Sequence, residues 1–266
     1  MPIQRTPIYQ VDAFATRRFE GNPAAVMPMQ AFPDDATMQS IAAENNLAET
    51  AFIVAQANGN YLLRWFTPAV EVPLCGHATL ASAAVVMERL EPGRTHVVFH
   101  TVKSGALTVQ RTGLGYTMDF PSRPSQPVAP PPGLAQALGV APVEVVVDAF
   151  NYLALLDSAQ TVRTLTPDIA AIARLDRSGL IVTAPGDGAY DFVSRYFAPA
   201  KGIAEDPVTG GAHCALAPYW AKRLGKTAFH AFQASRRGGE IACRLLGDRV
   251  ELQGSCVFYL EGFAEI

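Results

Sequence analysis

Three motifs occur twice along the chain in the same order, and this repetition constrains the fold more than any other feature. In each case the second copy follows the first at about half of the chain length. The paired segments are 11–14 with 147–150, 64–69 with 195–200, and 75–78 with 209–212. Ordered matches at a nearly constant offset indicate an internal duplication. A period this long predicts two similar domains of about 130 residues each, with a ligand site between the lobes where the copies have diverged.

Charge and composition narrow the class of partner. The net charge is −3, and the densest basic clusters are pairs, Arg17-Arg18 and Arg236-Arg237, so we expect no nucleic-acid surface. No apolar run approaches the roughly 20 residues of a membrane helix, and Met1 to Thr6 lack the pattern of a signal peptide. The four cysteines show no close metal-ligand spacing. We therefore expect a cytoplasmic protein with reduced thiols and no metal, nucleic-acid or membrane partner.

Each copy alternates short apolar strands with helices, which predicts an α+β fold. Helices are expected to open at residues 32–35, 76, 166–168 and 210, where capping residues or glycines precede apolar periodicity. The stretch 121–133 is rich in proline and is interpreted as a linker. The prediction is two pseudo-symmetric lobes, 1–120 and 134–266, each a mostly antiparallel sheet around a central helix.

Two glycines are candidates for binding an anion. Gly76 and Gly210 each follow a proline-containing loop and precede a helical run. Unpaired N–H groups and the helix dipole at such a position attract anions, and glycine lets a ligand approach the backbone closely. A carboxylate is the expected ligand. The alternative is that small residues simply let the two helices pack centrally.

The copies differ in their acidic groups, which are the candidates for chemistry. Glu44 closes the first helix of the first copy, and Asp206 precedes Gly210 in a segment longer than its counterpart. A carboxylate in an enclosed pocket is suited to act as both acid and base. The alternative for Glu44 is an ordinary exposed position on a helix. Cys75, before Gly76, is either reactive or a small buried residue.

Taken together, several motifs resemble the PhzF-like family of phenazine-biosynthesis isomerase homologues over essentially the whole chain. The motifs that carry the resemblance are Val11-Asp12-Ala13-Phe14, Gly21-Asn22-Pro23-Ala24, Glu44-x-Asn46-Leu47-Ala48-Glu49-Thr50, Glu71 to Thr79, and Glu205 to Ala212. The resemblance implies the diaminopimelate epimerase-like fold, with the last strand (257–263) packed back on the first lobe. It also implies a homodimer.

The same resemblance implies site residues and a mechanism. It matches the family's acid/base glutamate to Glu44, its supporting histidine and aspartate to His77 and Asp206, and its glycine N–H groups to Gly76 and Gly210. The implied reaction is cofactor-free: the glutamate moves a proton between carbons of a small carboxylate substrate. Gln233 and the following 236–239 resemble a substrate-contacting loop.

Departures from the family pattern leave two alternatives open. Gly211 stands where the phenazine-pathway isomerase has a serine, so dihydro-hydroxyanthranilate is not assured as the substrate. Cys75 matches one of the two thiols of related racemases and epimerases, whereas Thr209 stands at the other. Threonine is a poor replacement for a thiolate. The alternatives are a racemase or epimerase that uses Cys75, and a non-catalytic anion-binding homologue. For His213, helix packing is favoured over a place in the cleft.

Overall fold

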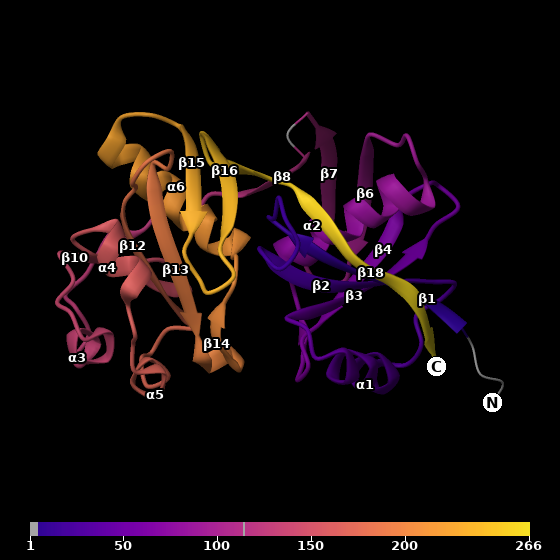
Figure 1. Ribbon diagram of the computed structural model, residues 1–266, viewed down its shortest axis with the longest axis horizontal. Helices are drawn as coiled ribbons and strands as arrows, with labels where there is room; N and C mark the ends of the chain where they lie inside the picture. The colour runs from indigo at the N-terminus through magenta and orange to yellow at the C-terminus, as the bar shows by residue number, and fades with distance from the viewer. Residues whose placement is uncertain (1–4, 114) are drawn as a thin grey trace. The chain divides into compact units, whose positions relative to one another are not determined.

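The computed structural model describes residues 5–113 and 115–266, so residues 1–4 of the N-terminal stretch considered above lie outside the described part. The chain divides into two compact units (Figure 1). The first comprises Met1–Asp119 and Gln253–Ile266, and the second comprises Phe120–Leu252. Each unit is a sheet that packs against a buried helix.

The sheet of the first unit has the neighbour order β18-β1-β2-β3-β4-β6-β7-β8. Two neighbouring pairs, β2 with β3 and β4 with β6, are parallel, and the others are antiparallel. The elements are β1 (Arg5–Ala13), β2 (Asn22–Met29), α1 (Asp35–Asn45), β3 (Glu49–Ala55), β4 (Tyr61–Phe66), β5 (Glu71–Val72), α2 (Gly76–Val85), the π-helical turn η1 (Val86–Leu90), β6 (His96–Thr101), β7 (Ala106–Thr112), β8 (Gly115–Pro121) and β18 (Cys256–Glu265).

Helix α2 is the central element of this unit. Nine of its ten residues are buried, and most of them are Ala, Ser or Thr. It contacts β1, β2, β3, β7 and β18. A helix that is covered on all sides needs side chains that let strands approach closely, and the small residues of α2 allow this. The rest of the unit therefore fixes the position of its first turn, at Gly76 and His77.

The sheet of the second unit repeats this arrangement. The neighbour order is β9-β10-β11-β12-β13-β15-β16, with β11–β12 and β13–β15 parallel. The elements are β9 (Gln126–Pro127), α3 (Leu134–Leu138), β10 (Glu144–Val147), β11 (Asn151–Leu155), α4 (Ala159–Thr164), α5 (Ile169–Ile172), β12 (Gly179–Pro185), β13 (Phe192–Ala198), the 3-10 turn η2 (Pro199–Lys201), β14 (Ile203–Asp206), α6 (Gly210–Leu224), β15 (Ala228–Gln233), β16 (Gly239–Leu246) and β17 (Arg249–Gly254).

The two units thus share one order of strands, with the same relative directions in each neighbouring pair. The corresponding strands are β1 and β10, β2 and β11, β3 and β12, β4 and β13, β6 and β15, and β7 and β16. The buried helices α2 and α6 occupy the same place in this order. The α+β class with mostly antiparallel sheets is confirmed. This shared topology supports the internal duplication, which stays a prediction.

The last strand lies where the resemblance implies: residues 253–266 belong to the first unit, and β18 pairs with β1 from Arg5 to Ala13 (Figure 1). Two other segments differ from the expectations. The stretch 121–133, interpreted as a linker, falls within the second unit and contains β9. Proline lacks only its own N–H, and the neighbouring Val128 N–H donates to the Val145 carbonyl at 3.2 Å. Helix α4 was not predicted, because its sequence has no strong apolar periodicity.

Candidate active site

Glu49 lies at the junction of α1 and β3, and the local sequence fixes that junction. Helix α1 ends at Asn46, whose φ of 48° and ψ of 36° are left-handed, a conformation that asparagine tolerates. The Asn45 side chain donates to the Thr50 hydroxyl at 3.1 Å and so ties the helix end to the next strand. Glu49 is the first residue of β3 and is only 8% exposed.

Cys75 and His77 flank the first residue of α2. Cys75 has an extended conformation at the N-cap position, and its side chain makes no capping hydrogen bond. Its carbonyl accepts from the Thr79 N–H at 3.2 Å, which starts the helix. Both side chains are buried, and Cys75 Sγ lies 3.4 Å from His77 Nδ1. The first turn of α2 therefore brings a thiol and an imidazole together.

The His77 ring connects this turn to Glu49. Its Nε2 lies 3.2 Å from Glu49 Oε2, and its Nδ1 lies 3.1 Å from the Asn22 amide nitrogen. The Nε2–Oε2 pair is a close contact of two buried polar atoms whose geometry does not make a hydrogen bond. Burial lowers the pKa of His77 to about 3, and a hydrogen bond with the Pro23 backbone offsets only part of this effect. At neutral pH His77 is therefore an uncharged ring next to Glu49.

Glu44, the glutamate matched from the sequence, does not join this cluster in the part of the chain that the structure describes. It is exposed in the last turn of α1. The buried face of that helix carries Met38 and Ala42, which pack with Phe52 and Phe66. At 3.6 residues per turn, Glu44 is about 200° around the helix from Ala42. Glu49 belongs to the same sequence motif as Glu44. The spacing of apolar residues in that motif did not show which of the two glutamates is buried.

In the second unit, Asp206 and Thr209 form the turn that precedes α6. The Thr209 hydroxyl donates to Asp206 Oδ2 at 2.6 Å. The buried Gln233 side chain holds both ends of the turn: its oxygen accepts from the Thr209 N–H at 2.8 Å, and its nitrogen donates to the Asp206 carbonyl at 2.8 Å and to the Thr209 hydroxyl at 3.1 Å. Gln233, singled out as part of a substrate-contacting loop, is here the support of Asp206 and Thr209.

Matching ion pairs hold the chain ahead of α2 and α6. Arg64 of β4 contacts Glu71 of β5 through Nε at 2.7 Å and Nη2 at 2.9 Å. Arg195 of β13 contacts Glu205 of β14 at the same two distances. Bidentate pairs fix orientation as well as distance. Both arginines lie in the repeated motif, so the duplicated sequence segment supports the same hairpin in each unit.

The glycines at the start of α6 are in different surroundings. Gly210 is buried, and a Cβ built on it would lie 3.3 Å from Leu252. A Cβ at Gly211 would meet only Arg123 Nη1, at 3.6 Å, which is an ordinary contact. The position therefore has room for the serine that the phenazine-pathway isomerase is expected to carry. The Arg123 guanidinium lies over the Phe150 ring, 4.7 Å from its centroid.

His213 has a structural environment. It is fully buried, its Nδ1 lies 2.8 Å from the Thr209 carbonyl, and its ring stacks on Phe192 at 6.0 Å. Burial lowers its pKa to about 4, and the Thr209 hydrogen bond opposes this shift. These contacts agree with the helix-packing interpretation.

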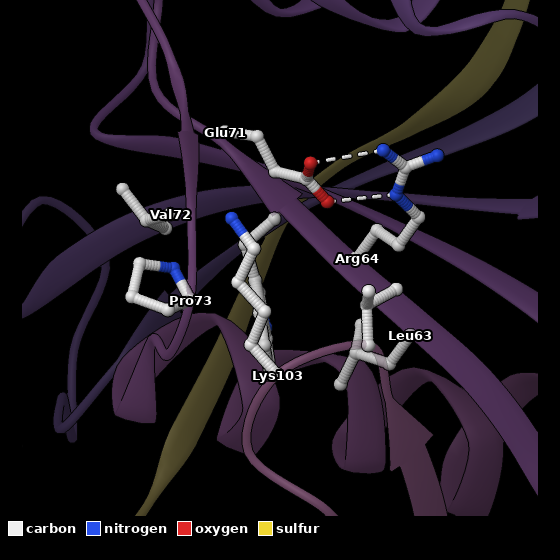
Figure 2. A pocket seen from close by; sticks show the side chains of 8 residues that line it. Leu63, Arg64, Glu71, Val72, Pro73 and Lys103 are labelled. Atoms are coloured by element: carbon white, nitrogen blue, oxygen red, sulfur yellow. Dashed lines mark hydrogen bonds and ion pairs between the residues drawn. The ribbon is translucent and has the colours of Figure 1, made fainter.

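A separate, shallow depression lies on the first unit (Figure 2) and is lined by Leu63, Arg64, Trp65, Glu71, Val72, Pro73, Val102 and Lys103. The Arg64 guanidinium is paired with Glu71 there and also with Asp35 at 2.8 Å. The charge of Arg64 is thus already compensated. This depression is a weaker candidate for an anion site than the helix starts.

Only one set of His, Cys, Asp and Glu side chains among the described residues has the spacing of metal ligands. Its members are Glu49, Cys75 and His77, whose ligand atoms lie within 4.8 Å of one another. The spacing of the cysteines along the chain did not predict this group, because Glu49 joins it only through the fold. In the described residues no helix has both the length and the apolar character of a membrane span.

Comparison with known proteins assigns the family. The family model described as phenazine biosynthesis-like protein matches residues 11–262. An uncharacterized isomerase of Pseudomonas aeruginosa is 49% identical over 255 residues, which cover 96% of this chain and 97% of that protein. A crystal structure of a PhzF-family phenazine biosynthesis protein from Enterococcus faecalis matches with a TM-score of 0.95 and 42% identity, over 99% of this chain and 100% of that one.

A more distant structure shows how widely the fold is shared. A hydroxyproline epimerase from Agrobacterium vitis has a TM-score of 0.64 at 11% identity, over 98% of this chain and 93% of that one. This likeness concerns the fold alone and confirms the predicted epimerase-like architecture. With the family match and the relatives named as isomerases, the chain belongs to the PhzC-PhzF family of phenazine biosynthesis-like proteins and is an isomerase.

Proposed function

We propose that this isomerase moves a proton between two carbons of a small carboxylate substrate, with Glu49 as the acid/base. One observation carries the assignment: Glu49 is buried and lies 3.2 Å from the Nε2 of a histidine that burial keeps neutral. Glu44 is exposed. A carboxylate that is to transfer protons to and from carbon needs shielding from water and a fixed orientation, and Glu49 has both.

The proton balance of this reaction needs no cofactor. The Glu49 carboxylate takes a proton from one carbon of the substrate, and the electron pair of that C–H bond enters the conjugated system. The carboxylic acid then returns the proton to another carbon, where a new C–H bond forms. Substrate and product have the same composition and oxidation state. Neutral His77 lies against the glutamate, and its role in this proposal is that of a positioning residue for Glu49.

Main-chain N–H groups at helix starts are proposed to bind anionic groups of the substrate, because the helix dipole favours negative charge there. The candidates are Gly76 at the start of α2 and Gly210 and Gly211 at the start of α6. The same dipoles stabilise the charge that develops when the proton is removed. Asp206, oriented by Thr209 and Gln233, contacts a polar group of the substrate.

A racemase or epimerase is the second candidate, favoured by the position of Cys75 at 3.4 Å from His77 Nδ1. Such an enzyme needs an acid or base on each face of the substrate carbon. Cys75 or Glu49 would supply one. Thr209, the match for the second thiol, already donates to Asp206 and accepts from Gln233. A hydroxyl engaged in this way is a poor base, which favours the one-base isomerisation.

The test of the reaction class uses chelator-treated enzyme in D2O with small unsaturated carboxylates, beginning with dihydro-hydroxyanthranilate. We expect a rearranged product of unchanged composition that carries deuterium at carbon, without any added cofactor. Deuterium exchange only at the α-carbon of trans-4-hydroxy-L-proline would support the racemase instead. Ligand-induced stabilisation without turnover or exchange would support a non-catalytic binding protein. A homodimer is also expected, and sedimentation velocity measures it.

A further inference from the structure

We propose that Glu49, Cys75 and His77 form a binding site for a thiophilic divalent metal ion, with Zn²⁺ as its representative, and that occupancy of this site inhibits the isomerase. The proposed metal binding is argued from the geometry of the three side chains. The proposed inhibition rests on the proposed function, in which Glu49 is the acid/base.

The three residues supply a ligand set that suits zinc. Thiolate sulfur, imidazole nitrogen and carboxylate oxygen are its preferred protein ligands, with bonds of about 2.3 Å to sulfur and about 2.0 to 2.2 Å to nitrogen and oxygen. Tetrahedral angles then put two ligands of one ion about 3.3 to 3.6 Å apart. The observed Sγ–Nδ1 distance is 3.4 Å and the Nε2–Oε2 distance is 3.2 Å.

One adjustment is needed to make all three groups bind the same ion. A metal ion binds one nitrogen of an imidazole, and Cys75 and Glu49 face different nitrogens of His77. The three ligand atoms already lie within 4.8 Å of one another. The proposal therefore requires a rotation of the His77 ring or of the Glu49 carboxylate, which has three rotatable side-chain bonds, with the backbones of α2 and β3 in place.

Charge also favours a divalent ion. All three side chains are buried, and a metal ion binds cysteine as the thiolate, so the coordinating thiolate and carboxylate carry two negative charges in a poorly solvated place. A divalent cation compensates two negative charges and replaces the lost solvation with direct bonds. A monovalent cation would leave one of the two negative charges uncompensated, and a hard cation such as Mg²⁺ binds sulfur poorly. The site is therefore selective for a thiophilic divalent ion.

Occupancy would block the proposed chemistry directly. Coordination uses the oxygen lone pair with which Glu49 accepts a proton, and it also engages the His77 ring that lies next to Glu49. With three protein ligands, a fourth position is left for water. The bound ion thus ties up the acid/base group, and its removal by a chelator restores it.

The test measures binding separately from activity. Chelator-treated enzyme is titrated with Zn²⁺ in competition with a chromophoric chelator, and with Co²⁺ to detect a thiolate-to-metal absorption band. We expect one ion per chain, a thiolate band, and affinity lowered at least about 100-fold in Cys75→Ser, beyond the 10- to 100-fold effect typical of outer partners. Glu49→Gln should weaken binding too. Cys256→Ser is the matched control, because Cys256 is also in the first unit but outside this cluster.

Several outcomes would overturn the inference. Absence of a thiolate band, or equal Zn²⁺ affinity in Cys75→Ser and Cys256→Ser with circular dichroism showing both folded, would refute the site. Binding of Zn²⁺ at this site without loss of turnover would refute inhibition. If no substrate is turned over at all, the proposed function fails, whereas Cys75-dependent metal binding still decides whether the site exists.

Discussion

His77 Nε2 lies 3.2 Å from Glu49 Oε2, and this contact joins the first turn of α2 to the first residue of β3. The two residues are 28 positions apart in sequence, and each comes from an element whose position is fixed by burial. The imidazole is uncharged because burial lowers its pKa, and its Nδ1 lies 3.1 Å from the Asn22 amide nitrogen. The proposed acid/base group therefore lies next to a side chain that carries no charge at neutral pH.

The neutrality of His77 has a consequence for NMR titration. Because burial lowers the pKa of His77 to about 3 and that of His213 to about 4, the rings of both should stay unprotonated from pH 8 down to pH 5. Chemical shifts of labelled histidine rings measure this. A midpoint near 6.5 for His77, assigned by loss of its signal in His77→Gln, would contradict the buried, uncharged ring.

The same shifts make folding stability depend on pH. In the unfolded chain these histidines bind protons near pH 6.5, whereas in the folded protein they do so only near pH 3 to 4. The unfolded state therefore binds more protons in this window, and the free energy of unfolding should fall as pH drops from about 6.5 toward 4. The slope is up to about 1.4 kcal/mol per pH unit for each histidine. Urea unfolding at several pH values gives the free energy of unfolding as a function of pH. This free energy should change less steeply with pH in His213→Phe than in the parent protein.

Gln233 is expected to support the Asp206–Thr209 turn. Gln233→Ala removes two donated hydrogen bonds and one accepted bond in a buried place, so the free energy of unfolding should fall by about 1 to 3 kcal/mol. The turn precedes α6, whose first residues are proposed to bind the substrate. We therefore expect kcat/KM to fall as well. Gln233→Glu is the informative partner variant: it keeps the acceptor for Thr209 but loses the donor to Asp206. Unfolding curves for both variants that match the parent would contradict this role.

Gly211→Ser should be tolerated. The new Cβ meets only Arg123 Nη1 at 3.6 Å, and serine in a helix is more favourable than glycine by a few tenths of a kcal/mol, so stability should change by less than about 1 kcal/mol. Thermal unfolding measures this. Gly210→Ala is the matched comparison, because its Cβ would lie 3.3 Å from Leu252. If Gly211→Ser also adds turnover of dihydro-hydroxyanthranilate, the glycine is a determinant of substrate choice.

Cys75→Ser distinguishes the two enzyme candidates. In the one-base isomerisation Cys75 neither gives nor takes the substrate proton, so kcat should stay within about tenfold of the parent, less than the 10²- to 10⁴-fold effect typical of a general acid/base. A racemase that uses the thiol would lose several orders of magnitude. Parallel assays with the metal removed keep this result independent of metal binding.

Much of the fold could be predicted from the sequence because its signals are local or repeated. The Arg64 and Arg195 motifs marked equivalent strands, β4 and β13, and Gly76 and Gly210 marked the starts of the two buried helices. Helix α4 was missed because its main sequence signal is the Ser158 cap, which accepts from the Thr161 N–H at 3.1 Å. A helix of six residues is too short for its helix propensity or its apolar periodicity to give a clear signal.

The site was less predictable because it depends on burial. Glu44 and Glu49 lie in one motif five residues apart, and the sequence assigned the role to Glu44. What separates them is packing: Met38 and Ala42 turn one face of α1 inward and leave Glu44 outside, whereas Glu49 begins a strand that is buried almost throughout. The partner of Glu49 comes from α2, and only the pairing of the strands around that helix brings them together.

The comparison of Glu49→Gln with Glu44→Gln tests the central claim most directly. Both substitutions remove one carboxylate, and both variants are expected to fold, so kcat and deuterium incorporation in D2O can be compared for the same substrate. We predict a loss of at least about 1,000-fold for Glu49→Gln, within the range for removal of a general acid/base, and less than about twofold for Glu44→Gln. Loss of turnover in Glu44→Gln with retained exchange in Glu49→Gln would contradict the assignment.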